Sequence, residues 1–327
     1  MLRSVVIGAA IFLLLCAAPT AWAGGAGTHL AAFLEVEGGA RQMGMGGAFT
    51  GLADDAMTVF YNPAGLARLE GSEIHIHNST WAAGVSYQHL AYGFRHSTLP
   101  GTMAFSWAVM QISPYRELSE YYDPQSPFGI GALDPVDAGD MSLGGSYCWD
   151  FGGGISAGAT LHWYHLHLAE AFCEGVYADA GLLYDTPFRN LRLGAAALNL
   201  GPKDRWAGTG SETGFGEEFP LPATYRVGAS IRLYDVVRHR LVVAADYKLP
   251  ADGEGKVNAG AEYTFNKGPI FVYGRAGYRV GYDEEGATFG AGVRFPSSKE
   301  AEVRVDYAFV DMGNLEPSQK VGVSFHF

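Results

Sequence analysis

Apolar and polar residues alternate along most of the chain, in segments of about ten residues. In residues 300–310, Val303 and Val305 point to one side while Arg304 and Asp306 point to the other. A period of two is typical of a β-strand whose two faces meet different surroundings. The pattern predicts about fourteen strands, at residues 72–80, 84–95, 101–112, 140–150, 153–166, 173–184, 190–200, 222–233, 239–248, 256–265, 269–280, 287–295, 300–310 and 318–327.

The alternation alone fits either a soluble β-sandwich or a membrane barrel. Three further features favour the barrel: an even number of strands, lengths that match a tilted crossing of the bilayer, and aromatic residues near the strand ends. The two longest connections, about 112–140 and 200–222, also fall on one side, opposite the short turns. We therefore expect an all-β protein, with residues 72–327 forming a 14-stranded antiparallel transmembrane β-barrel in the lipid of a Gram-negative outer membrane.

Both ends of the chain carry export signals. Residues 1–23 contain one basic residue, an apolar run and a small-residue site ending at Ala23, which predicts a secretory signal peptide. The last strand ends on Phe327, and a terminal aromatic residue after an alternating strand resembles the signal read by the barrel-assembly machinery. That machinery is accordingly an expected partner.

Composition and charge argue against a nucleic-acid partner, and the cysteine positions argue against a disulfide. The chain has 45 glycines among 327 residues, and its net charge of −12 provides no basic stripe for a nucleic acid. The predicted mature chain keeps Cys148 and Cys173. One strand is expected to lie between theirs, a separation of about 9–10 Å, so we expect two unpaired thiols.

Residues 24–71 do not alternate and are rich in glycine. A barrel of this width leaves a lumen that wall side chains do not fill, so we expect this segment to fold inward as a plug. Its aspartates can cap a short helical turn, and an Asn-Pro pair favours an extended residue followed by a turn. The residues assigned to the plug motif are Gly44, Gly46, Gly47, Asp54, Asp55, Asn62, Pro63, Ala64 and Gly65.

The polar strand faces place charges in the predicted lumen. These are Arg226, Arg232, Arg275, Arg294 and Arg304, with Glu262, Glu302 and Asp306 as partners. They could brace the wall and the plug or form a polar path for an anionic solute, and the need of buried charges for partners favours bracing. Two histidine pairs, His75/His77 and His165/His167, lack a third ligand at a suitable spacing, so we expect no metal, no cofactor and no enzyme activity.

One strand breaks the pattern. In residues 84–95 the apolar positions are odd-numbered at Val85 and Tyr87 but even-numbered from Leu90 onward. A slip of one residue would turn the later side chains to the wrong face, so the break predicts a β-bulge at Gln88 and His89. Such a bulge could adjust the curvature of the wall or open it sideways.

The segment from Gly39 to Gly71, "GARQMGMGGAFTGLADDAMTVFYNPAGLARLEG", resembles the N-terminal motif of PorV/PorQ-type outer-membrane proteins, relatives of the FadL transporters. Its Asn-Pro-Ala triplet is similar to that of the FadL hatch, and its glycine-rich part is closer to PorV. The resemblance implies a fourteen-stranded barrel with one of two roles. A PorV-like barrel would serve type IX secretion, receiving secreted cargo proteins at its outer loops together with other secretion components. A FadL-like barrel would take up hydrophobic solutes. The polar long loops favour the first role, and the second is the alternative.

Overall fold

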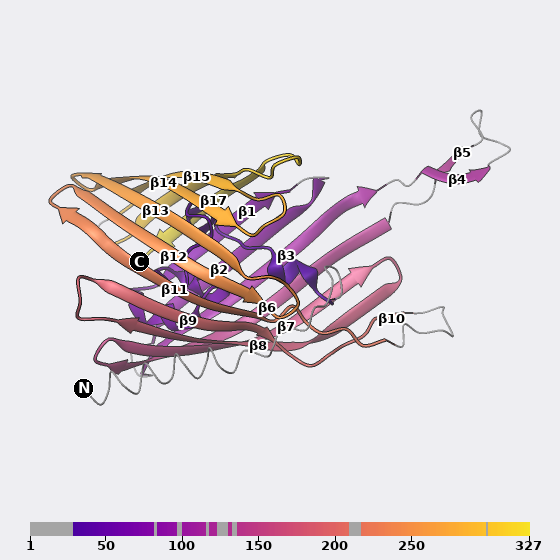
Figure 1. Cartoon of the computed structure of the whole chain (residues 1–327), viewed down its shortest axis with the longest axis horizontal. Helices are drawn as coiled ribbons and strands as arrows, with labels where there is room; N and C mark the ends of the chain where they lie inside the picture. The colour runs from indigo at the N-terminus through magenta and orange to yellow at the C-terminus, as the bar shows by residue number, and fades with distance from the viewer. Residues whose placement is uncertain are drawn as a thin grey trace.

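The computed structural model describes residues 29–81, 84–96, 100–115, 118–122, 130–132, 136–208, 217–298 and 300–327. The predicted signal peptide lies outside these residues. Fourteen strands of the described chain form a closed antiparallel barrel (Figure 1), which confirms the predicted fold class. They are β1 (Glu73–Thr80), β2 (Ser86–Arg95), β3 (Thr102–Tyr115), β6 (Val136–Gly152), β7 (Ile155–Leu168), β8 (Ala171–Asp185), β9 (Leu191–Leu200), β11 (Thr224–Val236), β12 (His239–Pro250), β13 (Lys256–Lys267), β14 (Ile270–Val280), β15 (Ala287–Pro296), β16 (Glu302–Val310) and β17 (Ser318–His326).

The barrel closes where its first and last strands meet. β1 pairs with β17 from Glu73 opposite His326 to Thr80 opposite Gln319. Two backbone hydrogen bonds between Ser72 and Phe327, of 2.8 and 2.9 Å, extend this pairing to the C-terminus. No unpaired edge therefore remains at the seam, as a membrane barrel requires.

The barrel wall is apolar outside and charged inside. On β16, Val305 and Tyr307 are about 40% exposed on the outer surface, whereas Arg304 and Asp306 are buried on the inner one. A soluble protein has the opposite arrangement, and an apolar outer band is what lipid contact requires. The barrel thus lies in the outer membrane. In the described part of the chain, no helix is both long enough and apolar enough to cross a membrane.

The wall is taller on one side. β3, β6, β7 and β8 have 14 to 17 residues, whereas β15, β16 and β17 have 9 or 10. The tall strands project beyond the rest of the barrel, and the β4–β5 hairpin (Leu118–Tyr122 and Ile130–Ala132) lies farther out (Figure 1). The short strand β10 (Ala207–Gly208) pairs antiparallel with the first residues of β8 at the same end. Both long connections therefore leave from one end, opposite the C-terminus, as the sequence predicts.

The predicted bulge at Gln88 and His89 is wrong. β2 pairs with β1 and with β3 without a register shift at these residues. Tyr87 and His89 both face the interior, and Tyr87 packs edge-on against Phe33 with ring centroids 6.3 Å apart. The apolar pattern breaks because this part of the inner wall contacts protein rather than water. Tyr87 is therefore an inward residue and not part of the lipid face.

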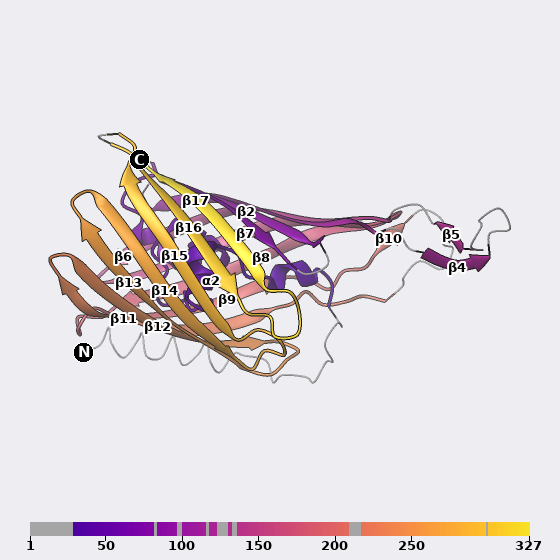
Figure 2. The same ribbon diagram turned by 90° about the horizontal axis from the view of Figure 1, so that it is seen from above.

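Residues 29–71, which we call the plug, lie inside the barrel and are almost entirely buried from Gly38 to Leu66 (Figure 2). The plug contains the short helical elements η1 (Ala32–Glu35), α2 (Ala40–Gly44), η2 (Ala56–Phe60) and η3 (Pro63–Arg68). As predicted, an aspartate starts a helical turn: the Asp55 side chain accepts a hydrogen bond from the Met57 amide, and Asn62 caps η3 in the same way. Gly46 and Gly47 adopt positive φ angles of 68° and 79°, which permit the turn after α2.

The plug backbone lies directly on glycines of the wall. A Cβ atom on Gly260 would lie 2.2 Å from the carbonyl oxygen of Met45, and one on Gly194 would lie 2.1 Å from that of Thr50. No side chain fits at such distances, so these wall positions require glycine. Part of the high glycine content thus reflects the seating of the plug.

Candidate functional site

Arg41 of the plug lies in a buried network of charges centred on Glu262 of the wall. Its guanidinium donates two hydrogen bonds to Glu262, of 3.0 and 2.9 Å. It also donates to Asp54 at 2.6 Å and to Asp55 at 2.9 Å within the plug. On the wall side, Arg275 donates to Glu262 at 2.6 Å. The plug is therefore joined to the wall by charge-assisted hydrogen bonds, which are stronger than those between neutral groups.

Two more wall residues complete this network. Arg275 contacts Asp306 at 2.9 Å, and Arg304 contacts Asp306 at 2.8 Å and Glu262 at 3.6 Å. Their side chains are 7% exposed or less. Because each charge has a partner of opposite sign, the network can persist out of water.

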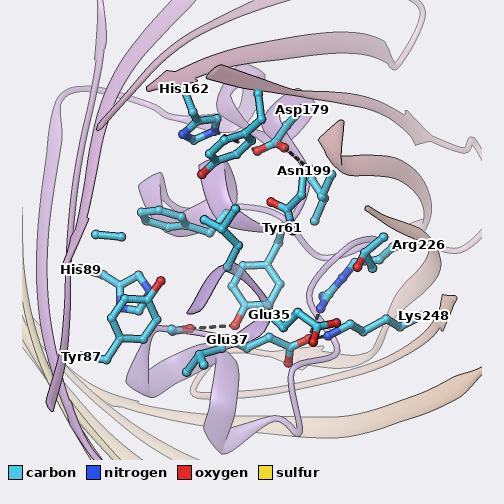
Figure 3. A pocket seen from close by; sticks show the side chains of 18 residues that line it. Glu35, Glu37, Tyr61, Tyr87, His89, His162, Asp179, Asn199, Arg226 and Lys248 are labelled. Carbon is cyan, nitrogen blue, oxygen red and sulfur yellow. Dashed lines mark hydrogen bonds and ion pairs between the residues drawn. The ribbon is translucent and has the colours of Figure 1, made fainter. Parts of the chain in front are cut away.

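A second network surrounds Glu37, which precedes α2 (Figure 3). Its carboxylate pairs with Arg226, with Lys248 at 3.2 Å and with Arg279 at 3.0 Å. Lys320 donates to the backbone carbonyl of Glu37 at 3.2 Å. One plug carboxylate thus meets cations from three wall strands, β11, β12 and β14, and its backbone meets a fourth cation from β17.

Side chains of the wall and of the plug also hold the plug backbone in place. One oxygen of Asp246 accepts the amides of Phe49 and Thr50, at 2.9 and 2.8 Å. Asn62 donates to the carbonyl oxygens of Thr50 and Leu182, at 2.9 and 3.0 Å. This asparagine therefore joins two turns of the plug to β8.

An outer vestibule of about 440 Å³ lies on the plug. Its apolar lining comes from Phe33, Val36, Met43, Trp81, Val85, Met110 and Val310, and its charged lining from Glu35, Glu37, Asp140, Lys248, Lys256, Arg279, Glu285 and Lys320. At the periplasmic end, a space of about 930 Å³ is lined by residues of both the plug and the wall, including Arg41 and Glu262. The plug separates these two spaces.

A small cavity of about 50 Å³ lies beside the plug, between Glu37 and the β8–β9 wall (Figure 3). Tyr61 lines it and donates from its hydroxyl to the carbonyl oxygen of Gly38 at 2.7 Å. Burial raises the pKa of Tyr61 above its ordinary value, so the hydroxyl stays protonated and acts as a donor. On the opposite wall, His162 contacts Asp179 at 2.9 Å.

The structure brings together some of the charged residues predicted for the lumen and separates others. Glu262, Arg275, Arg304 and Asp306 lie in one network, while Arg226 belongs to the network of Glu37. At the periplasmic rim, Arg232 pairs with Asp235 at 3.1 Å, and Arg294 pairs with Glu302 at 3.3 Å. These rim pairs are partly exposed and join wall residues only.

The plug-motif residues take three kinds of position. Gly44 lies against Gly290 of the wall, while Gly46 and Gly47 form the turn after α2. Asp54 and Asp55 contact Arg41. Asn62, Pro63, Ala64 and Gly65 form the capped start of η3, which lies against β6, β7 and β8.

The residues predicted from the sequence do not include Glu37, Arg41, Lys248 or Lys320. Glu37 and Arg41 flank the start of the glycine-rich motif, and isolated charges in a small-residue segment are the signal that could have identified them. The described residues contain no group of three or more His, Cys, Asp or Glu side chains arranged to hold a metal ion. Cys148 and Cys173 are buried free thiols.

Neither a protein-family model nor a curated protein matches the chain. In fold it is similar to solved outer-membrane channels. The CymD monoaromatic hydrocarbon channel is 14% identical, with a TM-score of 0.57 over 89% of this chain and 98% of that one. The toluene transporter TodX of Pseudomonas putida is 13% identical, with a TM-score of 0.56 over 89% and 98%. A FadL homologue of Pseudomonas aeruginosa is 11% identical, with a TM-score of 0.56 over 92% and 99%.

At these identities the likeness concerns the fold alone. The chain has the fold of FadL-like outer-membrane barrels. The more specific resemblance to PorV and PorQ stays a prediction.

Proposed function

We propose that this barrel takes up hydrophobic or amphipathic small molecules across the outer membrane, with the plug as its gate. The observation that carries the proposal is the plug itself, which divides the lumen below an outer vestibule with a partly apolar lining. Ligand sites are typically concave, mostly apolar and supplied with a few polar groups, and about 440 Å³ is within their usual range.

The likeness in fold to channels named for hydrocarbons supports this role. It favours uptake over the secretion role that the resemblance to PorV implied, which finds no support among the compared structures. In the proposed role, the plug motif and the two charge networks hold the gate closed. The solute would enter the vestibule, and movement of the plug would open the way inward.

A disulfide between plug and wall tests whether the plug must move. A Cβ atom on Gly93 would lie 3.5 Å from the Cβ of Ala56, within the range of a disulfide. Leu69 would have to shift, because its Cδ1 atom lies 2.4 Å from the same position. The double variant Ala56→Cys/Gly93→Cys should therefore be made with Cys148 and Cys173 replaced by alanine, so that no native thiol competes.

Uptake of N-phenyl-1-naphthylamine by Gram-negative cells that express the barrel gives a direct fluorescence readout. We expect the oxidised double variant to show only the uptake of cells that lack the barrel, and reduction to restore the rate. Each single-cysteine variant is the matched control and should respond to neither oxidant nor reductant. An oxidised barrel that takes up the probe as fast as the reduced one would contradict the proposed gate.

A further inference from the structure

We propose that His77 and His89 of the inner wall make docking of the plug depend on pH, so that acidification below about pH 6.5 loosens the plug. The docked plug requires both imidazole rings in the neutral form, whereas an undocked plug leaves them free to take up protons. As regulation of the gate, this inference rests on the proposed function, although docking of the plug can be measured without uptake.

His77 holds the start of α2. Its Nδ1 atom accepts a hydrogen bond from the backbone amide of Ala40 at 3.2 Å. The residue is 2% exposed, and its other ring nitrogen, Nε2, has no hydrogen-bond partner within the described chain. A neutral imidazole that accepts at Nδ1 carries its proton on Nε2. Protonation of Nδ1 would therefore break the bond to Ala40 and bury a positive charge.

His89 lies directly opposite His77 in the pairing of β1 with β2, and it too is 2% exposed. Its ring packs edge-on against Phe60 of the plug, with ring centroids 5.0 Å apart, and its centroid lies 4.0 Å from that of Tyr87 (Figure 3). The plug backbone also meets this ring, because a Cβ atom on Gly38 would lie 2.3 Å from its Cε1 atom. The docked plug thus encloses the ring between two aromatic side chains and its own backbone.

Within the described chain, neither His77 nor His89 forms an ion pair with a carboxylate. By contrast, the neighbouring His75 contacts Glu73 at 3.1 Å. The plug residues that touch the two rings carry no titratable side chain. The titratable and charged groups of the wall that face the two rings include one carboxylate, Asp306, which is already paired with two arginines. These wall groups are His75, Tyr87, Arg304, Asp306 and Lys320. A proton added to either ring would therefore lack a free anionic partner, which is unfavourable in a buried site.

The docked and undocked states of the plug differ in the number of protons that they bind. With the plug docked, both rings stay neutral. With the plug undocked, the rings face the lumen and titrate as histidines in water do, near about pH 6.5. Since the undocked state binds more protons below this value, docking weakens as the pH falls. Between about pH 7.5 and about pH 5, each histidine changes the docking equilibrium by about 30-fold, and the two together by about 10³-fold.

Hydrogen–deuterium exchange of the barrel in nanodiscs, at about pH 7.5 and about pH 5, tests the proposal. Protection factors, which remove the intrinsic pH dependence of exchange, are compared for peptides of residues 38–48 and 56–66. We expect the protection of the unaltered protein to fall by about 100-fold or more at the lower pH, where carboxylates with ordinary pKa values near about 4 stay mostly ionised. Equal protection at the two pH values would overturn the proposal.

The double variant His77→Asn/His89→Asn separates titration from packing. Asparagine keeps a side-chain acceptor for the amide of Ala40 but takes up no proton, so protection should differ by less than about threefold between the two pH values, whatever its absolute level. His162→Asn is the matched control: this ring also faces the lumen, but it contacts Asp179 at 2.9 Å, so the pH dependence should stay as in the wild type. A double variant that keeps the wild-type pH dependence would show that these two histidines are not its source.

The disulfide experiment answers a separate question about the gate. If the oxidised lock leaves uptake unchanged while acid still loosens the plug, the uptake function fails and the pH dependence of docking stands. If the lock stops uptake while plug protection is the same at both pH values, the uptake function stands and the role of the two histidines fails.

Discussion

Replacing Arg41 by glutamine should release the plug from the wall, because this side chain makes four hydrogen bonds to three carboxylates. Glutamine has nearly the same reach but no charge, so Glu262, Asp54 and Asp55 would each lose a cationic partner. Removing one member of a buried ion pair typically costs about 3–5 kcal/mol. Because the two hydrogen bonds to Glu262 join plug and wall, the loss of this ion pair weakens docking.

The expected effect is large enough to measure. A tenfold change in an equilibrium corresponds to about 1.4 kcal/mol, so the ratio of docked to undocked plug should fall by about 10²–10⁴-fold. Hydrogen–deuterium exchange of peptides from residues 40–55, measured in nanodiscs, reports this ratio directly. The strand peptides should keep their protection, because the wall keeps its own hydrogen bonds.

Two controls separate charge pairing from a general loss of stability. Arg189→Gln removes an exposed arginine of the β8–β9 turn that lies over the ring of Phe188, so plug exchange should not change. In Arg41→Gln/Glu262→Gln, both members of the plug–wall pair are removed together, and the double variant should lose less than the sum of the two single variants. Wild-type protection of the plug in Arg41→Gln would refute the reasoning.

Two further substitutions test the wall. Gly260→Ala places a Cβ 2.2 Å from the carbonyl oxygen of Met45, and such overpacking costs about 1–3 kcal/mol. Plug peptides should therefore exchange faster than in the control Gly274→Ala, where an added Cβ meets nothing within 4 Å. Val305→Arg puts a charge on the lipid face, which costs about 2–4 kcal/mol near the midplane, so it should lower the yield of folded, heat-modifiable barrel in outer membranes. The control Val305→Leu should leave this yield unchanged. Equal yields of the two variants would contradict the assignment of the lipid face.

The sequence predicts the barrel well because lipid and lumen impose a period of two on every strand. In β16 each outward residue meets lipid and each inward residue meets a polar interior, so the pattern can be read without knowing any contact. Strand ends differ by a few residues from prediction, most at β6, which begins at Val136 rather than near residue 140. There β6 projects beyond the shorter strands of the barrel, where lipid no longer imposes a period of two.

Alternation does not predict which side chains point inward where the inner wall contacts the plug. Tyr87 is apolar in character and points inward, because its neighbour is Phe33 and not water. Glu37 and Arg41 lie in a segment without a repeating pattern, and the wall side chains that pair with their charged groups are between 189 and 242 residues away in the sequence. Only the three-dimensional path of the plug brings these residues together, so no local pattern can reveal them.

From the two kinds of contact that seat the plug, we expect the plug to dock in an all-or-none manner. Ion pairs at Glu37 and Arg41 provide the attraction, while wall glycines such as Gly260 and Gly194 allow an approach so close that no small displacement is tolerated. A shift of about an ångström would break the fit at several glycines at once, because tightly packed surfaces do not deform continuously. Arg41→Gln and Gly260→Ala act on opposite sides of the plug–wall contact, yet both should raise exchange throughout residues 40–69 and not only near the altered residue. Exchange that rises in α2 alone, while η3 keeps its protection, would show that the plug opens in parts and would contradict a single docking equilibrium.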